Sequence, residues 1–140
     1  MRSLKITNSQ NGQSLISLLF FMVIGITVIS AATIILTTDI LSASTSEQSA
    51  MAYYEAEGGI EDALLRTLRN PTLTVDPSSA YKITTSDGVA KVYIQNSVSG
   101  GTITDTIVST GTSGSTVRKI QAVTGYISGK RTVTSWSEIQ

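Results

Sequence analysis

The sequence of 140 residues contains no cysteine and no histidine. Without cysteine, the chain has no disulfide framework, no thiol nucleophile and no thiolate metal site. Without histidine, it lacks the usual general base of enzymes and the commonest metal ligand in proteins. These two absences exclude thiol catalysis, histidine-based acid–base catalysis and zinc sites of the usual kinds.

Charged side chains are also scarce, since they make up 14% of the chain, against about 25% in an average soluble domain. Ten basic and ten acidic residues balance each other, so net charge gives no indication of a nucleic-acid partner or an acidic substrate. The deficit is local, because no charged residue occurs between Lys5 and Asp39. The length predicts one compact domain plus an anchor.

A long apolar run fills this uncharged stretch. Residues 15–36 contain roughly the 20 apolar positions that a helix needs to cross a bilayer. Arg2 and Lys5 precede the run, and Asp39 is the first charged residue after it. Positive-inside asymmetry therefore predicts a cytoplasmic N-terminus, a single membrane-spanning helix in contact with lipid, and an extracytoplasmic remainder.

Three interpretations of this N-terminal segment compete. It is a permanent single-pass anchor, or a secretory signal peptide with a cleavage site at Ser30-Ala31-Ala32, or a short leader that ends at Gly12. Apolar residues that resume at Ile34 and continue to Leu41 disfavour the secretory signal. The third interpretation starts from the position of Gly12, which follows a polar leader and directly precedes the apolar run.

The segment Asn11-Gly12-Gln13-Ser14-Leu15-Ile16-Ser17-Leu18-Leu19 resembles the class III signal of type IV prepilins. In that family, prepilin peptidase cuts after the glycine and the hydrophobic helix is retained. The resemblance implies cleavage between Gly12 and Gln13, and a mature, N-methylated N-terminus at Gln13.

Two positions depart from the pattern of this family. Gln13 stands where Phe or Met is usual, and Ser17 stands where the family normally carries Glu. In the family, that Glu neutralises the terminal amine of a neighbouring subunit inside the membrane, where an unpaired charge costs several kcal/mol. Minor pilins of the PilX type and tip pseudopilins of type II secretion often lack it. Ser17 therefore favours a minor subunit over a major, filament-building pilin.

Helical periodicity continues beyond the apolar run. Asp62 precedes Arg66 by four residues, the favourable order for an ion pair on a helix. Asn70-Pro71 ends the pattern, because proline restricts the residue before it and lacks a backbone donor. Apolar residues at spacings of three and four form one stripe. The stripe consists of Ala52, Ala56, Ile60, Ala63, Leu64 and Leu68.

Gly58-Gly59 lies inside this helical pattern, at a cost of roughly 1 kcal/mol per glycine relative to alanine. We favour a kink or a break between two helical pieces; the alternative is close approach of the helix backbone to another surface. The stretch from Tyr54 to Leu64 also resembles the Ala-Glu-Ala-Gly-Ile-Glu-Asp-Ala-Leu segment of PilX-like pilins.

From Thr72 onward the composition changes to Thr, Ser, Val, Ile and Gly, in short runs divided by turn pairs. The predicted strands are residues 80–86, 89–95, 102–110, 116–127 and 131–139. The predicted turns are Asp87-Gly88, Gly100-Gly101, residues 111–114 and Gly129-Lys130. Gly125 indicates a bulge. We expect Trp136 to be a core or sheet-face aromatic, because tryptophan is usually largely buried.

These patterns predict an α+β fold, in which a long, partly transmembrane N-terminal helix packs on a small antiparallel β-sheet, as in pilins. A small sheet alone buries too little surface, so the apolar stripe is expected to lie across it. The predicted parts are a leader (1–12), a transmembrane and filament-core helix (13–38), an extracytoplasmic amphipathic helix (39–70) and an antiparallel β-domain (71–140).

The sequence offers little catalytic chemistry. Its only carboxylate cluster is expected to be a solvated helix face rather than a cation site; the cluster consists of Glu55, Glu57, Glu61 and Asp62. The glycines of residues 111–116 are not followed by the lysine of a phosphate loop. We therefore expect no enzyme activity, no cofactor, no metal and no direct nucleic-acid binding.

The expected function is that of a minor pilin or pseudopilin. The subunit would be inserted in the cytoplasmic membrane and then enter, or initiate, a type IV pilus-like filament at the cell surface. Expected partners are other pilin subunits through the N-terminal helix, prepilin peptidase, the inner-membrane assembly platform and membrane lipid. The alternative is a membrane-anchored or secreted β-domain binding module that does not polymerise. An anchored hydrolase with a Ser–Lys pair has no support in the sequence.

Overall fold

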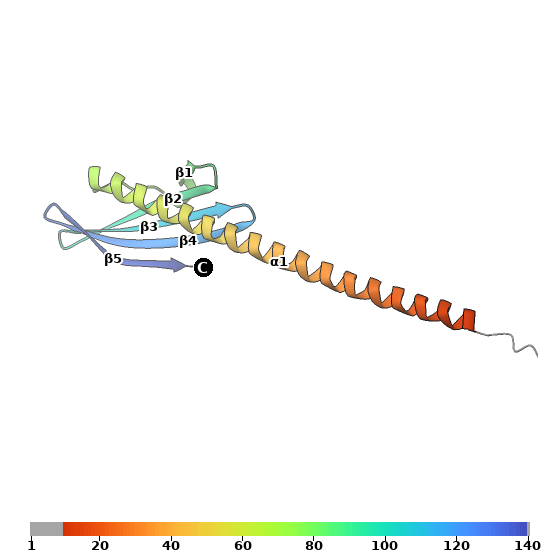
Figure 1. The fold of residues 1–140 in the computed structure, drawn as a ribbon. Helices are drawn as coiled ribbons and strands as arrows, with labels where there is room; N and C mark the ends of the chain where they lie inside the picture. The colour runs from red at the N-terminus through yellow and green to blue at the C-terminus, as the bar shows by residue number, and fades with distance from the viewer. Residues whose placement is uncertain (1–9, 140) are drawn as a thin grey trace, which may run out of the picture. The chain divides into compact units, whose positions relative to one another are not determined.

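The computed structural model describes residues 10–139 of the chain, and side chains from residue 13 onward. The described part folds into one long helix, one short 3-10 helix and five strands (Figure 1). These elements are α1 (Gln10–Arg69), η1 (Pro77–Ser79), β1 (Tyr81–Thr84), β2 (Val89–Ser99), β3 (Thr102–Ser113), β4 (Thr116–Ile127) and β5 (Lys130–Ile139). The chain divides into two compact units between Ala43 and Ser44.

The second unit is a five-stranded antiparallel sheet with the C-terminal part of α1 packed on one face (Figure 1). The strand order is β1-β2-β3-β4-β5, so every strand pairs with its neighbour in sequence. Short turns between consecutive strands produce this simple meander. The α+β fold, a long helix that is apolar toward its N-terminus and packs on an antiparallel sheet, is thus confirmed.

Successive side chains of a strand point to opposite faces of the sheet, so every second residue faces the helix. In β2, Ala90, Val92 and Ile94 are buried, as the sequence predicts, while Lys91 and, after Ile94, Gln95 are exposed. The core joins these residues to apolar side chains of α1, β3 and β4, and each fully buried Val or Ile contributes about 1.5–3 kcal/mol. Its largest members are Ile60, Ile94, Ile107, Ile120 and Val92.

The apolar stripe of α1 is confirmed over most of its length. Ala52, Ala56, Ile60 and Ala63 are fully buried, and Leu64 is half-buried against the core. Leu68 is not part of the packed face, since 56% of it is exposed. Thr67 takes the next buried position, because a step of four from Ala63 stays on the face that meets the sheet.

Gly58-Gly59 does not break the helix, so the expectation of two separate helical pieces at this point is wrong. The helix runs without interruption from Gln10 to Arg69. A Cβ atom at Gly59 would overlap the hydroxyl of Ser109 and lie 2.9 Å from a methyl group of Val92. Gly59 therefore permits close approach of the helix backbone to the sheet, which was the alternative prediction.

Gly111 has the same role from the side of the sheet. It lies within β3, not in the turn predicted over residues 111–114, and a Cβ atom there would lie 2.5 Å from the amide nitrogen of Ala56. The actual turn is Gly114-Ser115, since Ser113 pairs with Thr116. Glycine occupies this position of β3 because the helix leaves no room for a side chain there.

Two predicted turns and the predicted bulge shift by a few residues. The first turn spans residues 85–88, because Thr84 pairs with Val89 and the amide of Thr85 donates to the Gly88 carbonyl at 3.0 Å. The last turn is Ser128-Gly129, both with positive φ, instead of Gly129-Lys130. Thr134 in β5, not Gly125, is the extra residue at the register shift between β4 and β5.

Candidate functional site

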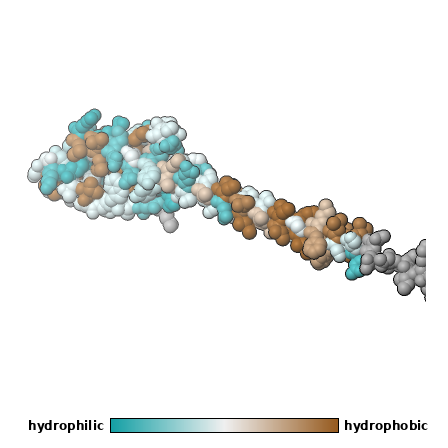
Figure 2. Space-filling view, viewed as in Figure 1, coloured by the Kyte–Doolittle hydropathy of each residue, from teal (hydrophilic) through white to brown (hydrophobic). Residues whose placement is uncertain are grey.

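The N-terminal part of α1 is the most unusual surface of the chain. Almost every residue from 13 to 43 is exposed, including Phe20 (65%) and Phe21 (73%), and the surface of this segment is largely hydrophobic in Figure 2. It lies in the one helix of the described residues that is long and apolar enough to cross a membrane. By its length and composition, such a helix could cross a membrane or act as a signal sequence.

Threonines within this apolar segment satisfy their own hydroxyl groups. The Thr27 hydroxyl donates to the Ile24 carbonyl at 2.8 Å, and the Thr33 hydroxyl donates to the Ile29 carbonyl at 2.9 Å. Bonds to the preceding turn leave no unpaired hydroxyl in a lipid environment. The threonines of this segment are therefore compatible with a membrane span.

The three residues singled out by the prepilin resemblance lie in the first two turns of α1. Because the helix begins at Gln10, the predicted cleavage bond between Gly12 and Gln13 is inside it. Gln13 and Ser17 are exposed, and a spacing of four places them on the same helix face. Most of the predicted leader, residues 1–9, lies outside the described residues.

The carboxylates of α1 do not converge on one point. Glu55 accepts a hydrogen bond from the Thr85 hydroxyl, whereas Asp62 forms the predicted ion pair with Arg66 at 2.6 Å. Within residues 10–139, no group of three or more carboxylates is arranged to hold a metal ion.

Tyr81 of β1 packs beside that ion pair. The Arg66 guanidinium carbon lies 4.5 Å from the centre of the Tyr81 ring, a cation–π contact. Burial of the phenol raises the pKa of Tyr81, and the neighbouring Asp62 carboxylate raises it further. The native state therefore holds this proton more tightly than the unfolded chain does.

This raised pKa predicts a loss of stability at high pH. The contribution of Tyr81 is fully present below its ordinary pKa of 10.0 and is lost as the pH rises through the raised value. Tyr81→Phe is expected to reduce this loss, whereas Tyr54→Phe, at a position 68% exposed, is expected to leave it unchanged. Urea unfolding of the three proteins on either side of pH 10.0 measures the difference; equal pH dependence would contradict the assignment.

A buried ion pair under the end of α1 was not predicted from the sequence. Arg131 of β5 binds the Asp105 carboxylate of β3, and their side chains are 4% and 0% exposed. Arg131 also donates to the Thr124 hydroxyl at 2.7 Å and to the Thr67 carbonyl of α1 at 3.0 Å. The pair therefore connects β3, β4, β5 and the helix at one point.

Asn96 extends this polar cluster to the chain that leaves the helix. Its amide donates to the second oxygen of the Asp105 carboxylate at 2.9 Å and to the Pro71 carbonyl at 3.3 Å. One signal in the sequence could have identified the cluster: Asp105 occupies a helix-facing position of β3, two residues before Ile107. A charge at such a position requires a buried partner.

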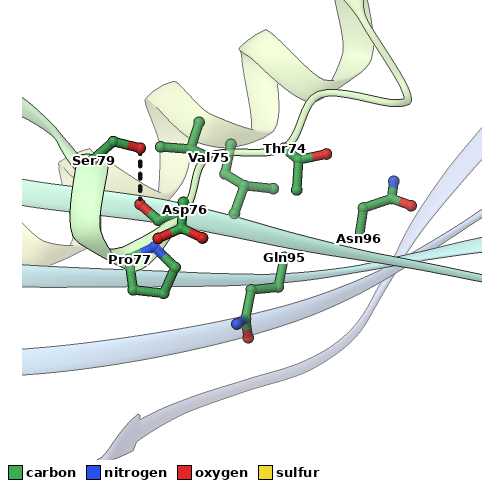
Figure 3. A pocket seen from close by; sticks show the side chains of 8 residues that line it. Thr74, Val75, Asp76, Pro77, Ser79, Gln95 and Asn96 are labelled. Carbon is green, nitrogen blue, oxygen red and sulfur yellow. Dashed lines mark hydrogen bonds between the residues drawn. The ribbon is translucent and has the colours of Figure 1, made fainter.

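A shallow pocket of about 510 Å³ lies between η1, the segment before it and β2 (Figure 3). Asp76 is its only carboxylate, and it accepts hydrogen bonds from the Ser78 amide at 2.8 Å and the Ser78 hydroxyl at 2.6 Å. These bonds lower the pKa of Asp76. The Asp76 carboxylate caps η1, and the Asn96 amide donates to Asp105 and to the Pro71 carbonyl. These two polar side chains of the pocket therefore hold the loop between α1 and β1 in place.

The candidate functional surface is therefore the apolar N-terminal segment of α1 rather than a pocket. No family model, curated protein or solved structure matches the chain. The long helix, apolar toward its N-terminus and packed through its C-terminal part on a five-stranded antiparallel sheet, gives the chain a pilin-like architecture.

Proposed function

We propose that the chain is a minor pilin or pseudopilin, which enters or initiates a type IV pilus-like filament. The observation that carries this proposal is the continuity of α1: one helix exposes an uncharged apolar segment from Gln13 to Thr38 and then supplies the packing face of a β-domain. Such a helix is suited to leave the membrane and pack against the same segments of other subunits.

In this proposal, prepilin peptidase removes residues 1–12 and Gln13 becomes the methylated N-terminus. The subunit is held in the cytoplasmic membrane with its N-terminus inside, because Arg2 and Lys5 precede the span. The assembly platform of the inner membrane then moves the helix from lipid into the filament. The alternative, a membrane-anchored or secreted binding module, keeps the β-domain but requires no filament.

Ser17 determines the kind of subunit. An incoming major pilin usually brings a Glu at this position, which pairs with the terminal amine of a subunit already in place. A serine cannot neutralise that amine, although the amine at Gln13 can still receive a carboxylate from the next subunit. Such a chain suits a position that is filled first, namely the tip or an initiating complex.

We therefore expect the chain in low copy number, at the ends of filaments built from a Glu-bearing pilin. Quantitative mass spectrometry of sheared filaments, together with immunogold labelling, measures both quantities. If the chain is instead the dominant component and is labelled along the whole filament, the minor-subunit assignment is wrong.

A further inference from the structure

Strand β5 is the one long free edge of the described sheet (Figure 1). It is ten residues long and pairs with β4 alone among the described strands, so alternate residues direct their amide and carbonyl groups away from the sheet. Every residue from 132 to 138 is exposed, and residues 132–137 contain no charge and no proline. Such an edge is a template for a further strand. The opposite edge strand, β1, has only four residues, and just beyond its end Val75 pairs with Ile94 of β2.

The bulge in β5 places two large apolar side chains on one face. Val133 pairs with Thr124, and Trp136 pairs with Ala122; both partners are buried residues of the helix-facing side. Because side chains alternate along a strand, positions 133 and 136 would face opposite ways without the extra residue, Thr134. The bulge turns both toward the side of the helix, yet Val133 is 46% exposed and Trp136 is 39% exposed. The described part of α1 therefore leaves this part of the sheet largely uncovered.

The flank of α1 nearer to β5 is apolar as well. Glu55 and Arg66 contact the β1 side of the domain, so the opposite flank of the helix points toward β5. That flank consists of Tyr53, Glu57, Leu64 and Leu68, at spacings of four and seven. Tyr53 and Leu64 are half-buried against the core, and Leu68 is 56% exposed. We call these four residues, together with Val133 and Trp136, the β5 ledge.

The charge on the β5 ledge is negative. Glu57 lies within the ledge, and Glu61 follows one helical turn later. Neither glutamate forms an ion pair with any described residue. The arginines of β4 and β5, Arg118 and Arg131, are already paired with other carboxylates. A partner that is complementary to this ledge therefore combines apolar side chains with a basic one.

An extended strand fits the edge and the ledge at once. Its backbone satisfies the free amide and carbonyl groups of β5, and every second side chain falls on the ledge. We propose that β5 receives a strand from a different protein, with apolar residues on the side of α1 and a lysine or arginine that reaches Glu57. The inference rests on the proposed function, under which that protein is another subunit of the filament. One long free edge accepts one such strand, as suits a subunit in low copy number.

A second copy of this chain does not suit the edge. Near the start of β5, Arg131 donates to the Thr67 carbonyl. Near its end, Glu138 pairs with Arg118, which donates to the Ser49 hydroxyl. The packed part of α1 therefore runs opposite to β5. An antiparallel pair of β5 strands would give the two helices opposite directions, whereas the same charges around the span give every copy in a membrane one direction. A parallel pair joined at this edge would face opposite ways, so the polar outer side of the second β5 would meet the ledge.

Photo-cross-linking along β5 tests the added strand. Benzoylphenylalanine replaces Thr132, Ser135 or Ser137, one at a time, in the full-length chain, in cells that produce the whole assembly. Mass spectrometry of the cross-linked peptides is expected to find one segment of one other protein, contacted in order along its length. The same replacement at Gln95, an exposed position in β2, is expected to give a yield at least tenfold lower.

Order along the segment distinguishes a strand from other contacts. Cross-links to a second copy of this chain, to lipid alone, or to many proteins without a common segment overturn the proposal. Absence of any product at all three positions of β5 overturns it as well.

Substitutions on the β5 ledge supply matched variants. Trp136→Lys is expected to lower the yield at Ser137 at least tenfold, because it puts a charge among the apolar side chains; Tyr54→Lys, at an aromatic residue 68% exposed outside the ledge, is the control. Glu57→Lys is expected to lower the yield at least fivefold, and Glu47→Lys to leave it unchanged. Glu57 has no ion pair to lose, so its variant keeps the test valid if Trp136→Lys fails to fold. Unchanged yields in both ledge variants overturn the proposal.

The same preparation separates this inference from the proposed function. Filaments that contain the chain but give no ordered cross-links from β5 overturn the added strand and leave the pilin assignment intact. Ordered cross-links to one other membrane protein, with the chain absent from every filament, support the added strand and contradict the pilin assignment.

Discussion

Gly12→Leu is expected to abolish maturation of the chain in a host that contains prepilin peptidase. The peptidase of the resembled family requires a small residue before the bond that it cuts, whereas insertion of α1 in the membrane depends only on its apolar residues. The unprocessed chain therefore accumulates in the membrane and does not enter filaments. Gly25→Leu, within the span, is the matched control, because a Cβ atom there meets nothing within 4 Å.

The intact mass of the protein in the membrane fraction measures cleavage of the leader. A reporter fused after Gln140 measures insertion of α1 in the membrane separately. The mass of the Gly12→Leu protein should include the leader, while the reporter stays active outside the cytoplasm. If Gly12→Leu and the parent chain give the same shortened mass, another protease produces the mature N-terminus.

Arg131→Ala is expected to be the most damaging substitution in the β-domain. It leaves the Asp105 carboxylate buried without its cation and removes the hydrogen bond to the Thr67 carbonyl. Loss of one partner of a buried ion pair costs about 3–5 kcal/mol of the free energy of unfolding. Arg118→Ala, which breaks an ion pair whose side chains are 43% and 41% exposed and the hydrogen bonds from Arg118 to the Ser49 hydroxyl of α1, is expected to cost less, about 1 kcal/mol, because these interactions are exposed to solvent.

Urea unfolding of the full-length chain in detergent, followed by fluorescence of Trp136, measures both values, since this is the only tryptophan of the chain. Replacement of both partners, Asp105→Leu with Arg131→Met, should recover a large part of the loss, because no charge then remains buried. Similar values for Arg131→Ala and Arg118→Ala would contradict this expectation, because the buried pair would then contribute no more to the free energy of unfolding than the exposed arginine does.

Local patterns in the sequence predicted the elements of the fold. The helix stop before Pro71 follows from proline chemistry, and alternation in β2 identified Ala90, Val92 and Ile94 as buried. Features that depend on contacts between elements far apart in the sequence were not predictable from such local patterns. Gly111 has the appearance of a turn residue, and only the proximity of the Ala52–Ala56 backbone explains its place in a strand.

The burial of Trp136, at the edge of the sheet, was also not predictable from local patterns in the sequence. Trp136 pairs with Ala122 on the helix-facing side, as a sheet-face aromatic, yet it remains 39% exposed. Strand β5 is an edge strand, so Trp136 has a paired strand on one side only. Burial of an aromatic residue depends on what covers it, and the sequence of β5 alone carries no such information.

Some features of the candidate site were predictable from the sequence, and others were not. The apolar run and its missing charges predicted an exposed helix able to enter a membrane, because those properties are local. The roles proposed for Ser17 and Gln13 depend on neighbouring subunits, which a single chain does not contain. The Asp105–Arg131 pair joins residues far apart in the sequence, so its partners become evident only from the register of the sheet.

Mass spectrometry of the chain in sheared surface filaments tests the central claim most directly. The expected result is a chain that begins at Gln13 with a methylated amine and retains the apolar segment of α1 within the filament. A chain that begins at Thr33 and is recovered only from the medium, with none in filaments, would contradict the claim and identify a secreted β-domain.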